Sequence, residues 1–434
     1  MTLKEAGVIL IDCDHKTPKA QESGRPYVGI PQLKDCRITL DGARLISEED
    51  FVHWRRKAKP QEHDVILSRR CNPGETGYVT GDLEIALGQN LVLLRSNGEN
   101  IYPPFLRWLT RGKYWWNQVD AFINVGAVFE SLKCADIPKF EILVPSLEEQ
   151  KLLTACMSSL DDKIALNTLT NQTLEQIAQT IFKSWFVDFD PVKAKMNGKQ
   201  PEGMDAATTS LFPEKLVDTD VGELPEGWKL VPVGELLDKT IGGDWGKEEP
   251  DEKHTEEVRI VRGTDIPRLH GGAIESVPVR YVESKKLKTR KLERGDIVIE
   301  VSGGSKDQPT GRTLFVSDNI LKRLELPSEP ASFCRRFKPK TYEIGLLLAV
   351  HFQLMYQAGK TWEYQNQSTG ISNFQTKYFL EAEHIVIPSD DVLDAFVKQV
   401  SPMMDMIHSN QNIELAKLRD TLLPKLLSGE ITLD

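Results

Sequence analysis

The sequence is poor in the residues and runs on which several protein classes depend. Its 434 residues include 6 cysteines, scattered with no CxxC pair and no histidine at ligand spacing, so neither a zinc site nor a disulfide framework is indicated. The longest apolar run, around Ile344 to Val350, is far shorter than the roughly 18 residues that a membrane-spanning helix needs. The start, MTLKEAGVILIDCD, has neither a basic n-region nor a cleavage site. We therefore expect a globular cytoplasmic protein with reduced thiols and no membrane contact.

No methyltransferase motif is complete. NIYPPFL (Asn100 to Leu106) is close to the NPPF or DPPY loop with which amino-methyltransferases hold a flipped base, but Tyr102 stands where that loop needs Asn or Asp. No glycine-rich cofactor loop follows a strand upstream of it. Pro103 and Pro104 are instead expected to start a helix. The residues that this helix should bury are Phe105, Leu106 and Leu109.

Phosphate-binding, hydrolytic and metal-dependent motifs are missing too. GGSKDQPTGRT (Gly303 to Thr313) has Lys306 and Arg312 where a phosphate loop needs Gly and Lys, and the 8 histidines form no recognisable local motif. DFDPVKAK, around Asp188, offers carboxylates and lysines, but a metal-dependent nuclease holds such groups on adjoining strands. Here they lie where an expected helix runs into a connector, so a structural role is favoured. The chain is expected to hold no metal and to do no chemistry itself.

The chain is acidic overall, with a formal net charge of -10, which taken alone argues against a polyanion as partner. Charge is local, however, and three segments are basic: His53 to Arg70, Arg280 to Asp296 and Phe333 to Lys340. A single basic run is usually a solvated face. Two such runs at matching places of a repeat would instead favour binding to a polyanion.

An internal repeat organises the chain. When Pro145 is set over Pro388, the apolar positions of FEILVPSLEEQKLLTACMSSLDDKI coincide with those of AEHIVIPSDDVLDAFVKQVSPMMDMI. Upstream, in the same order, GAVFESL lies near GISNFQT and HDVILS matches GDIVIE. Each copy therefore predicts a mixed domain with strand-like runs, a strand that ends in VP or IP, and then a long helix.

Both expected long helices have a heptad seam. From Leu153 to Trp185 the seam residues follow at steps of four and three over about five heptads, a pattern typical of a coiled coil. Asn167 and Asn171 lie in the middle of this seam, where buried amides fix register. In the second helix, Pro402 is expected to kink or interrupt the first turns. The two helices are predicted to form an antiparallel pair, with an interface that includes Leu153, Leu160, Ile164, Leu174, Ile181, Trp185, Val400, Ile407, Leu415, Leu418 and Leu422.

These patterns divide the chain. The aromatic stretch FKSWFVDFDP marks the end of the first helix, because Trp185 continues the seam whereas Pro191 cannot extend the helix. The expected parts are a mixed domain at 1–145, a helix at 146–190, a connector at 191–223, a second mixed domain at 224–388 and a second helix at 389–434. The predicted fold class is thus α/β (α+β) domains in tandem repeat, separated by two long antiparallel coiled-coil helices.

Four segments together resemble the specificity subunit of type I restriction-modification systems. They are VPSLEEQKLL (Val144 to Leu153), LDDKIALNTLTNQTLEQIAQTIFKSWFVDFDPVKAK (Leu160 to Lys195), LPEGW (Leu224 to Trp228) and LRDTLLPKLLSGEI (Leu418 to Ile431). HKTP, VRGTDI and TGISNF also resemble segments of the target recognition domains of that family. The resemblance covers essentially the whole chain. It is weaker at the start of the first domain, which has no counterpart of LPEGW.

The resemblance implies a DNA-recognition subunit with no catalytic activity of its own. Each of two target recognition domains would read one half of a bipartite site in double-stranded DNA, and the helix pair would set the length of the unread spacer. Two methyltransferase subunits carrying S-adenosylmethionine would dock on this scaffold. Two restriction or motor subunits, which use ATP and Mg²⁺, would join for cleavage. No cofactor is expected in this chain.

The chemistry of DNA reading suggests which residues touch the DNA. Lys and Arg hold phosphates, whereas base edges are distinguished by Arg to guanine and by Asn or Gln to adenine. In the first domain we predict contacts from Lys16 and Thr17, in the HKTP loop, and from Arg69 and Arg70, just after a strand. In the second domain the predicted contacts follow the runs VRI and IVIEVS, and they are Arg262, Thr264, Lys306, Gln308 and Arg312.

Two other classes of protein stay open on the residues alone. The first is a stand-alone methyltransferase or nuclease, which the missing motifs disfavour. The second is a scaffold that binds only proteins. In that case, charge reversal of both basic loops would leave site-specific modification intact.

Overall fold

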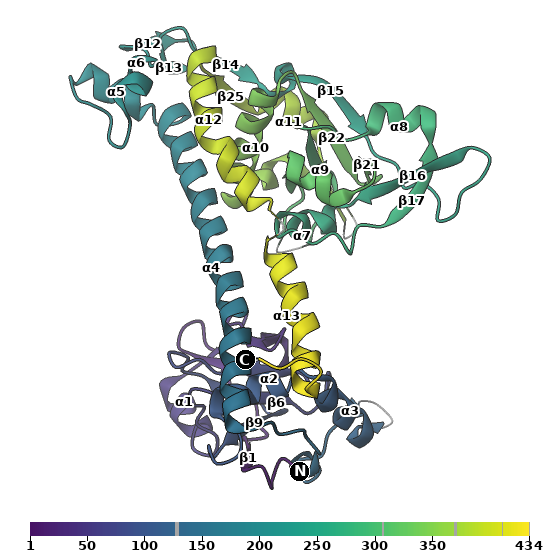
Figure 1. Ribbon diagram of the computed structural model, residues 1–434. Coiled ribbons are helices and arrows are strands. Elements are labelled where there is room, and N and C mark those ends of the chain that lie inside the picture. Colours follow the sequence, from purple (N-terminus) through teal and green to yellow (C-terminus); the bar gives the residue numbers. More distant parts are fainter. Residues whose placement is uncertain (126–129, 306–307, 369–370, 410, 434) are drawn as a thin grey trace. The chain divides into compact units, whose positions relative to one another are not determined.

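The computed structural model describes residues 1–125, 130–305, 308–368, 371–409 and 411–433. The chain divides into two compact units: unit 1 holds Met1–Lys163 and Leu415–Asp434, and unit 2 holds Ile164–Glu414. Each unit contains a mixed domain of helices and sheets together with parts of the long helices (Figure 1). Within the described ranges no helix is long and apolar enough to cross a membrane.

The core of unit 1 is a four-stranded antiparallel sheet with the order β1-β9-β6-β7. Its strands are β1 (Val8–Asp12), β6 (Val65–Ser68), β7 (Thr76–Tyr78) and β9 (Leu91–Ser96). Successive side chains of a strand point to opposite faces of a sheet, and both faces of this sheet are covered. Val65 and Leu67 lie in one hydrophobic cluster, whereas Ile66 between them lies in another. Burial on both sides explains why this strand is an uninterrupted apolar run.

Unit 1 also has a three-stranded sheet of order β5-β2-β8, in which β2 is antiparallel to β5 and parallel to β8. Its strands are β2 (Arg25–Val28), β5 (Arg44–Ile46) and β8 (Ala86–Leu87); the short pairs are β3 (Leu33–Lys34) with β4 (Arg37–Ile38) and β10 (Asn124–Val125) with β11 (Glu130–Ser131). The helical elements are η1 (Ile30–Gln32), α1 (Glu48–Trp54), η2 (Pro103–Phe105), α2 (Leu106–Leu109), α3 (Lys113–Phe122) and η3 (Ile137–Lys139). Pro103 starts a helical turn as predicted, and Phe105, Leu106 and Leu109 are buried.

Unit 2 repeats this plan. Its four-stranded sheet has the order β15-β22-β18-β20, and its three-stranded sheet has the order β17-β16-β21. The strands are β15 (Leu237–Gly242), β16 (His254–Val261), β17 (Val279–Glu283), β18 (Ile297–Glu300), β20 (Thr313–Phe315), β21 (Ser328–Pro330) and β22 (Cys334–Pro339). In chain order they correspond one to one with β1, β2, β5, β6, β7, β8 and β9, and the parallel pair, β16 with β21, recurs as well. Strand topology therefore confirms the internal repeat.

The remaining elements of unit 2 cover these sheets and connect them. Paired strands are β12 (Leu216–Thr219) with β13 (Gly222–Pro225), β14 (Lys229–Pro232) with β25 (His384–Ile387), and β24 (Ile371–Phe374) with both β19 (Ser302–Gly303) and β23 (Gln365–Ser368). Helical elements are η4 (Val233–Leu236), η5 (Gly263–Asp265), α7 (Ile266–His270), α8 (Ser284–Arg290), α9 (Asp318–Leu324), α10 (Tyr342–Gln357), η6 (Lys360–Tyr364) and α11 (Thr376–Ala382). The longest apolar run of the sequence lies in α10 and is buried from Ile344 to Val350. It is a core helix.

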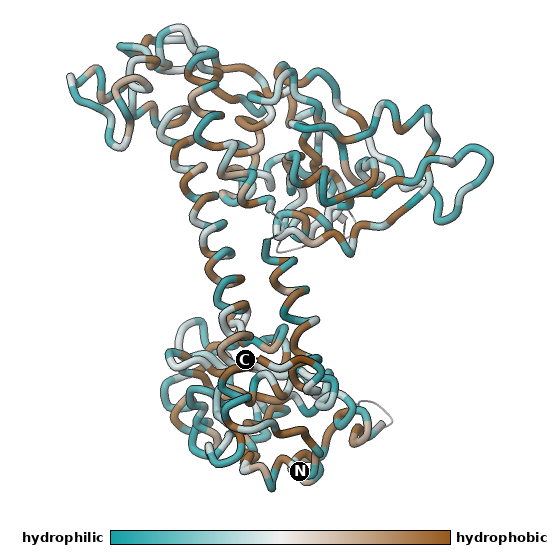
Figure 2. Tube along the Cα trace, in the orientation of Figure 1, coloured by the Kyte–Doolittle hydropathy of each residue, from teal (hydrophilic) through white to brown (hydrophobic). Residues whose placement is uncertain are grey.

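The first long helix, α4 (Leu147–Phe186), has 40 residues and is about 60 Å long at the usual rise per residue. Every predicted seam position from Leu153 to Trp185 is buried or half-buried, whereas Leu166 and Leu169 beside the seam are exposed. Figure 2 shows hydrophobic and hydrophilic residues alternating along this helix. The heptad pattern on α4 is therefore confirmed.

The second long helix differs from its prediction. The structure has two helices there, α12 (Asp390–Ile407) and α13 (Gln411–Ser428). Pro402 lies inside α12 without interrupting it, and the predicted kink stays a prediction. Val400 and Met404 on either side of it are anchored in the core of unit 2. The helix ends instead at Ile407, next to the fully buried His408. Burial of this polar ring, rather than the proline, marks the break.

The helices α4 and α13 run antiparallel. Within unit 1, Arg419 Nη1 donates a hydrogen bond to Asp161 Oδ1 at 2.6 Å. Within unit 2, Asn412 Nδ2 donates to Thr168 Oγ1 at 3.0 Å. From Asp161 to Thr168 the contact point moves seven residues towards the C-terminal end of α4. From Arg419 to Asn412 it moves seven residues towards the N-terminal end of α13. The predicted antiparallel arrangement is confirmed for these two helices.

Two details of the predicted helix interface can be compared with the structure. Asn167, one of the two amides in the seam, donates from Nδ2 to Gln411 Oε1 at 3.4 Å, so a polar contact does lie in the middle of the pair. Leu415 and Leu422 are half-buried. Leu418, in contrast, is 47% exposed, and its assignment to the interface is corrected, because it lies on the solvent side of α13.

The C-terminal end of α4 is an aromatic cluster in unit 2. The ring centres of Trp185 and Phe212 are 5.0 Å apart, and those of Phe186 and Phe396 of α12 are 5.1 Å apart. Phe189 then takes a left-handed conformation with φ 56, which turns the chain away from the helix axis. The connector that follows contains α5 (Asp190–Met196) and α6 (Ala206–Ser210). The interpretation of this stretch as a helix terminus is confirmed.

Candidate nucleic-acid interface

Loops from distant parts of unit 1 meet at one edge of its four-stranded sheet. Both β1 and β6 are antiparallel to β9, with Asp12 opposite Val92 and Ser68 opposite Leu91. The loops that leave β1 and β6 therefore lie beside the loop that enters β9. We name this edge, with the loops 13–24, 69–75 and 88–90, the unit 1 strand-end surface.

The four DNA contacts predicted in the first domain all lie on this surface. Lys16, Thr17 and Arg70 are exposed, and Arg69 is half-buried. The backbone N–H of Arg69 donates to the carbonyl of Asn90 at 2.9 Å, which ties the loop after β6 to the loop before β9. The structure thus brings these residues together, and their contact with DNA stays a prediction.

The loop after β1 is fixed by hydrogen bonds that leave Lys16 free. His15 Nε2 lies 3.0 Å from Asp12 Oδ2, and His15 Nδ1 lies 3.1 Å from the carbonyl oxygen of Gln89. The carbonyl of Lys16 accepts a hydrogen bond from Trp54 Nε1 at 3.0 Å. The His15 ring and the backbone of Lys16 are thereby held in place, while the exposed side chain of Lys16 extends into solvent.

The same loop places three possible metal ligands together. The ligand atoms of Asp12, Cys13 and His15 lie within 4.8 Å of one another. Burial raises the pKa of Cys13 to about 11, so its thiol is protonated at neutral pH and donates to the carbonyl of Gly88 at 3.0 Å. Metal binding requires a thiolate, and the imidazole is already engaged by Asp12. These contacts hold the loop, and we assign no metal to them.

Unit 2 has the matching edge. Here β15 and β18 are antiparallel to β22, with Gly242 opposite Arg335 and Glu300 opposite Cys334. We name this edge, with the loops 243–253, 262–265, 301–312 and 331–333, the unit 2 strand-end surface. Of the DNA contacts predicted in the second domain, Thr264 and Gln308 are exposed on it, Arg262 and Arg312 are half-buried, and Lys306 lies outside the described residues.

Two of these predicted arginines already bind buried carboxylates. Arg312 donates through Nε and Nη2 to Glu300, at 2.8 and 2.6 Å. Arg262 donates through the same two atoms to Asp265, at 2.9 Å each. Glu300 and Asp265 are buried, so turning either arginine towards a base would leave a buried charge unpaired. The geometry favours a loop-holding role for both, and their contact with DNA remains an untested prediction.

The repeat points to a loop that sequence reasoning missed. Asp244 is the second residue after β15, as Asp14 is the second residue after β1. Both accept a contact from a lysine in or just after a helix: Lys57 lies 2.8 Å from Asp14, and Lys286 lies 3.3 Å from Asp244. Trp245, which follows Asp244, is therefore the counterpart of His15, which follows Asp14 in the HKTP loop. The signal in the sequence was a shared aspartate before an exposed ring and a lysine, DHK in one copy and DWGK in the other.

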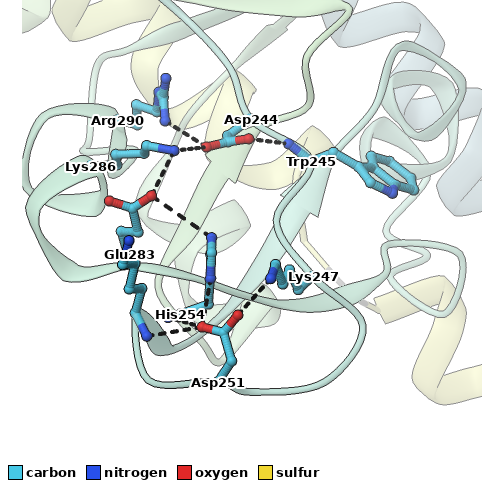
Figure 3. A network of polar contacts seen from close by, with 9 residues as sticks. Asp244, Trp245, Lys247, Asp251, His254, Glu283, Lys286 and Arg290 are labelled. Carbon is cyan, nitrogen blue, oxygen red and sulfur yellow. Dashed lines mark hydrogen bonds and ion pairs between the residues drawn. The ribbon is translucent and has the colours of Figure 1, made fainter.

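Figure 3 shows the network that holds this second loop. Asp244 accepts hydrogen bonds from Arg290 Nη1 at 2.9 Å and from the N–H of Trp245 at 2.8 Å. The Trp245 ring points away from the network and is 40% exposed. Further along, hydrogen bonds from Lys247 and His254 hold the pKa of Asp251 well below its usual range. The loop is thus a built structure with a ring at its tip.

The two longest basic runs also lie at matching places. The first follows α1, which comes after β5, and the second contains α8, which comes after the corresponding strand β17. The cations that they carry are Arg55, Arg56, Lys57 and Lys59 in one copy and Lys285, Lys286, Lys288, Arg290 and Lys291 in the other. Because the two basic runs occupy matching places of the repeat, they favour a polyanion as partner, as the sequence analysis expects for such a pair.

Comparisons with known proteins agree with this arrangement. Residues 10–176 match the family model described as the type I restriction modification DNA specificity domain. The chain is 25% identical over 418 residues to the HindI type I restriction enzyme specificity subunit of Haemophilus influenzae, covering 84% of this chain and 86% of that protein. It is 27% identical over 406 residues to the MjaIX specificity subunit of Methanocaldococcus jannaschii, covering 91% of this chain and 83% of that protein.

A solved structure shares the fold. The type I restriction-modification S subunit from M. genitalium superposes with a TM-score of 0.52 at 14% identity, covering 98% of this chain and 95% of that chain. Two copies of one mixed domain, each leading into a long helix, define a tandem-domain protein. Over most of its length the chain is thus similar to type I restriction-modification specificity subunits, and residues 10–176 match the DNA specificity domain of that family.

Proposed function

We propose that this chain recognises a bipartite DNA site and that each unit reads one half of it. The observation that carries the proposal is the matched pair of strand-end surfaces, formed by loops that follow corresponding strands in two copies of one domain. A duplicated reader suits a site with two separated halves, because each copy can meet its own bases. Exposed cations on both surfaces supply the phosphate contacts that position a protein on DNA.

In this proposal α4 and α13 set the length of the unread spacer. The hydrogen bonds at Asp161 and Thr168 join the two helices at points seven residues apart. A helix rises about 1.5 Å per residue, and DNA rises about 3.4 Å per base pair. A helix pair of fixed length would therefore correspond to a fixed number of unread base pairs.

Exposed apolar residues on α4 support the docking of protein partners. Leu166 is 56% exposed, Leu169 is 60% exposed and Ile177 is 40% exposed. Such apolar surface on a helix is typical of an interaction site. We propose that two methyltransferase subunits, which carry S-adenosylmethionine, dock on the helix pair. Restriction or motor subunits that use ATP and Mg²⁺ would join for cleavage, and this chain would contribute recognition without a catalytic group.

The proposal can be tested by reconstitution. The full chain is mixed with its methyltransferase subunits and S-adenosylmethionine, and the methylated positions on plasmid DNA are mapped by sequencing. A single bipartite motif with one spacer length is expected, and it should vanish when the chain is omitted. Methylation without any motif beyond background would contradict DNA recognition. Methylation by the chain alone would support a stand-alone enzyme instead.

A second arm separates DNA reading from a protein-only scaffold. Lys16→Glu with Arg70→Glu reverses two exposed charges on the unit 1 strand-end surface, and Lys247→Glu reverses one on the unit 2 surface. Phosphate contacts add to affinity independently of sequence, so methylation should weaken and become more sensitive to salt. Unchanged methylation at all salt concentrations would favour a scaffold that touches only proteins.

A further inference from the structure

The unit 2 strand-end surface contains a hollow of about 770 Å³ at the start of β22. Ser302, Phe333, Arg335, Asn373 and Tyr378 are among the residues that line it. The hollow therefore combines a guanidinium group, an amide and aromatic rings. These are the groups with which proteins hydrogen-bond to base edges and pack against bases.

Arg335 differs from Arg312 and Arg336 near this edge because its guanidinium group has no partner among the residues that the structure describes. Its neighbour Arg336 is buried and lies 2.7 Å from Asp296, and Arg312 is held by Glu300. In the described part of the chain no hydrogen bond or ion pair engages the side chain of Arg335. It is half-buried at the rim of the sheet, so a ligand in the hollow can reach it without breaking an internal contact.

Phe333, two residues earlier, presents its ring to solvent. The side chain is 65% exposed, although removing an aromatic ring from water is favourable. Tyr378, on the same hollow, is 53% exposed. The Tyr378 ring also contacts Tyr364, with ring centres 5.8 Å apart. Two exposed rings beside Arg335 indicate a surface that a planar ligand covers.

The polar lining is arranged to donate hydrogen bonds. Asn373 Oδ1 accepts from Ser302 Oγ at 3.0 Å, which fixes the amide and leaves its nitrogen to donate to a ligand. Glu381 also lines the hollow, and its carboxylate lies 4.0 Å from the ammonium group of Lys377. The lining thus offers hydrogen-bond donors from Arg335 and Asn373, and the charge of its one carboxylate, Glu381, is offset by Lys377.

We propose that this hollow reads bases of the half-site taken by unit 2, with Arg335 donating to O6 and N7 of a guanine and Phe333 covering the neighbouring base or sugar. The inference rests on the proposed function and names the reading residue. It adds Arg335, on β22, to the contacts predicted from the sequence. Arg262 and Arg312 pair with buried carboxylates, and their contact with DNA stays a prediction.

The test uses the reconstituted complex and the motif mapped by sequencing. Arg335→Gln removes the guanine reader, and Arg335→Ala is the second variant. Lys338→Ala is the matched control, because it removes the same charge from the same strand, pairs with Glu293 at 2.8 Å and does not line the hollow. Circular dichroism and the thermal midpoint show whether each variant stays folded.

The expected result is confined to one position of one half-site. Both Arg335 variants should lose the preference for guanine there by roughly tenfold, while the other half-site and the spacer length stay as in the unaltered chain and the control. An unchanged motif, or an equal loss at both half-sites in a folded variant, overturns the assignment. If the unaltered chain yields no bipartite motif, the proposed function itself is overturned, and this assignment with it.

Discussion

The Asp161 carboxylate on α4 accepts a hydrogen bond from Arg419 on α13 at 2.6 Å and another from Arg107 on α2. Burial raises the pKa of this carboxyl, but Arg419 and Arg107 lower it by more, so its pKa lies below the ordinary value. One buried charge therefore joins three helices of unit 1.

Replacing Asp161 by Asn should loosen the attachment of α13. Half-buried Arg107 loses its counter-charge and half-buried Arg419 keeps only Asp420, at a cost of up to about 3–5 kcal/mol. Hydrogen exchange of the α13 amides should become faster, whereas Asp162→Asn, on the exposed neighbour, should leave it unchanged. Equal exchange in both variants would contradict this role.

The contribution of Asp161 should also depend on pH. Because the pKa of Asp161 in the folded chain is depressed, its stabilisation is present above the unfolded pKa and is lost as pH falls towards the folded value.

A histidine pair, with His408 buried and His270 half-buried, should make unit 2 sensitive to mild acid. His408 Nε2 lies 3.3 Å from His270 Nδ1, and His408 Nδ1 lies 2.9 Å from Ser317 Oγ. Burial lowers the pKa of both histidines. The unfolded chain therefore takes up protons first as pH falls through about 6.5, so stability is complete above that pH and is lost below it.

The measurement is the thermal midpoint of unit 2 between about pH 7.5 and pH 5.5. It should fall in the unaltered chain and fall less in His408→Gln. The exposed His384, replaced in the same way, is the control and should keep the full pH dependence. A midpoint that does not change over this range would show that the pair is not coupled to folding.

Glu329 should destabilise unit 2 in alkaline solution. Among the described residues neither of its carboxylate oxygens has a hydrogen-bond partner, and burial raises its pKa to about 7. The folded pKa lies above the unfolded value of 4.5, so the cost is absent below that pH, grows as pH rises from there to about 7, and is complete above it. Its counterpart in unit 1 is Ala86, at the same register position of the parallel pair. Glu329→Gln should raise the thermal midpoint at about pH 8.5 and change it little at about pH 4; a rise of equal size at both would refute the assignment.

A charge in the seam of α4 should abolish modification at every site. Ile181 is half-buried and packs against the core of unit 2, and Asp at this position would place a charge in apolar surroundings. Ile181→Asp, reconstituted with the methyltransferase subunits, should give no motif at all. Thr180→Asp, one residue away and exposed, should give the unaltered motif. A soluble and fully active Ile181→Asp variant would argue strongly against the role of the helix pair.

Patterns that depend on near neighbours in the sequence were readable from it. The seam of α4 was predicted at every position, because each seam residue repeats the same local spacing. The apolar run of β6 and its repeat in β18 were found for a similar reason: strands covered on both faces need apolar residues throughout. The repeat of two such domains followed from these matches.

Features set by long-range contacts were not readable. The break after Ile407 depends on a polar ring that is buried against Ser317, 91 residues away, and no local signal reports it. Arg312 looked like a free loop arginine until the register placed it beside Glu300. Arg335 and Trp245 were missed because they lie at strand ends that only the sheet order brings to the same edge. The side chains at such an edge do not pack in the core, so the fold does not determine which residues stand there. They therefore show no regular spacing of apolar and polar residues in the sequence.

The most direct test of the central claim is a change confined to unit 1. Arg69→Ala with Arg70→Ala alters one strand-end surface and leaves the other intact. After reconstitution with the methyltransferase subunits, sequencing of the methylated DNA should show one half of the bipartite motif relaxed or changed, with the other half and the spacer length preserved. Loss or alteration of both halves together, in a folded variant, would contradict a chain in which each unit reads its own half-site.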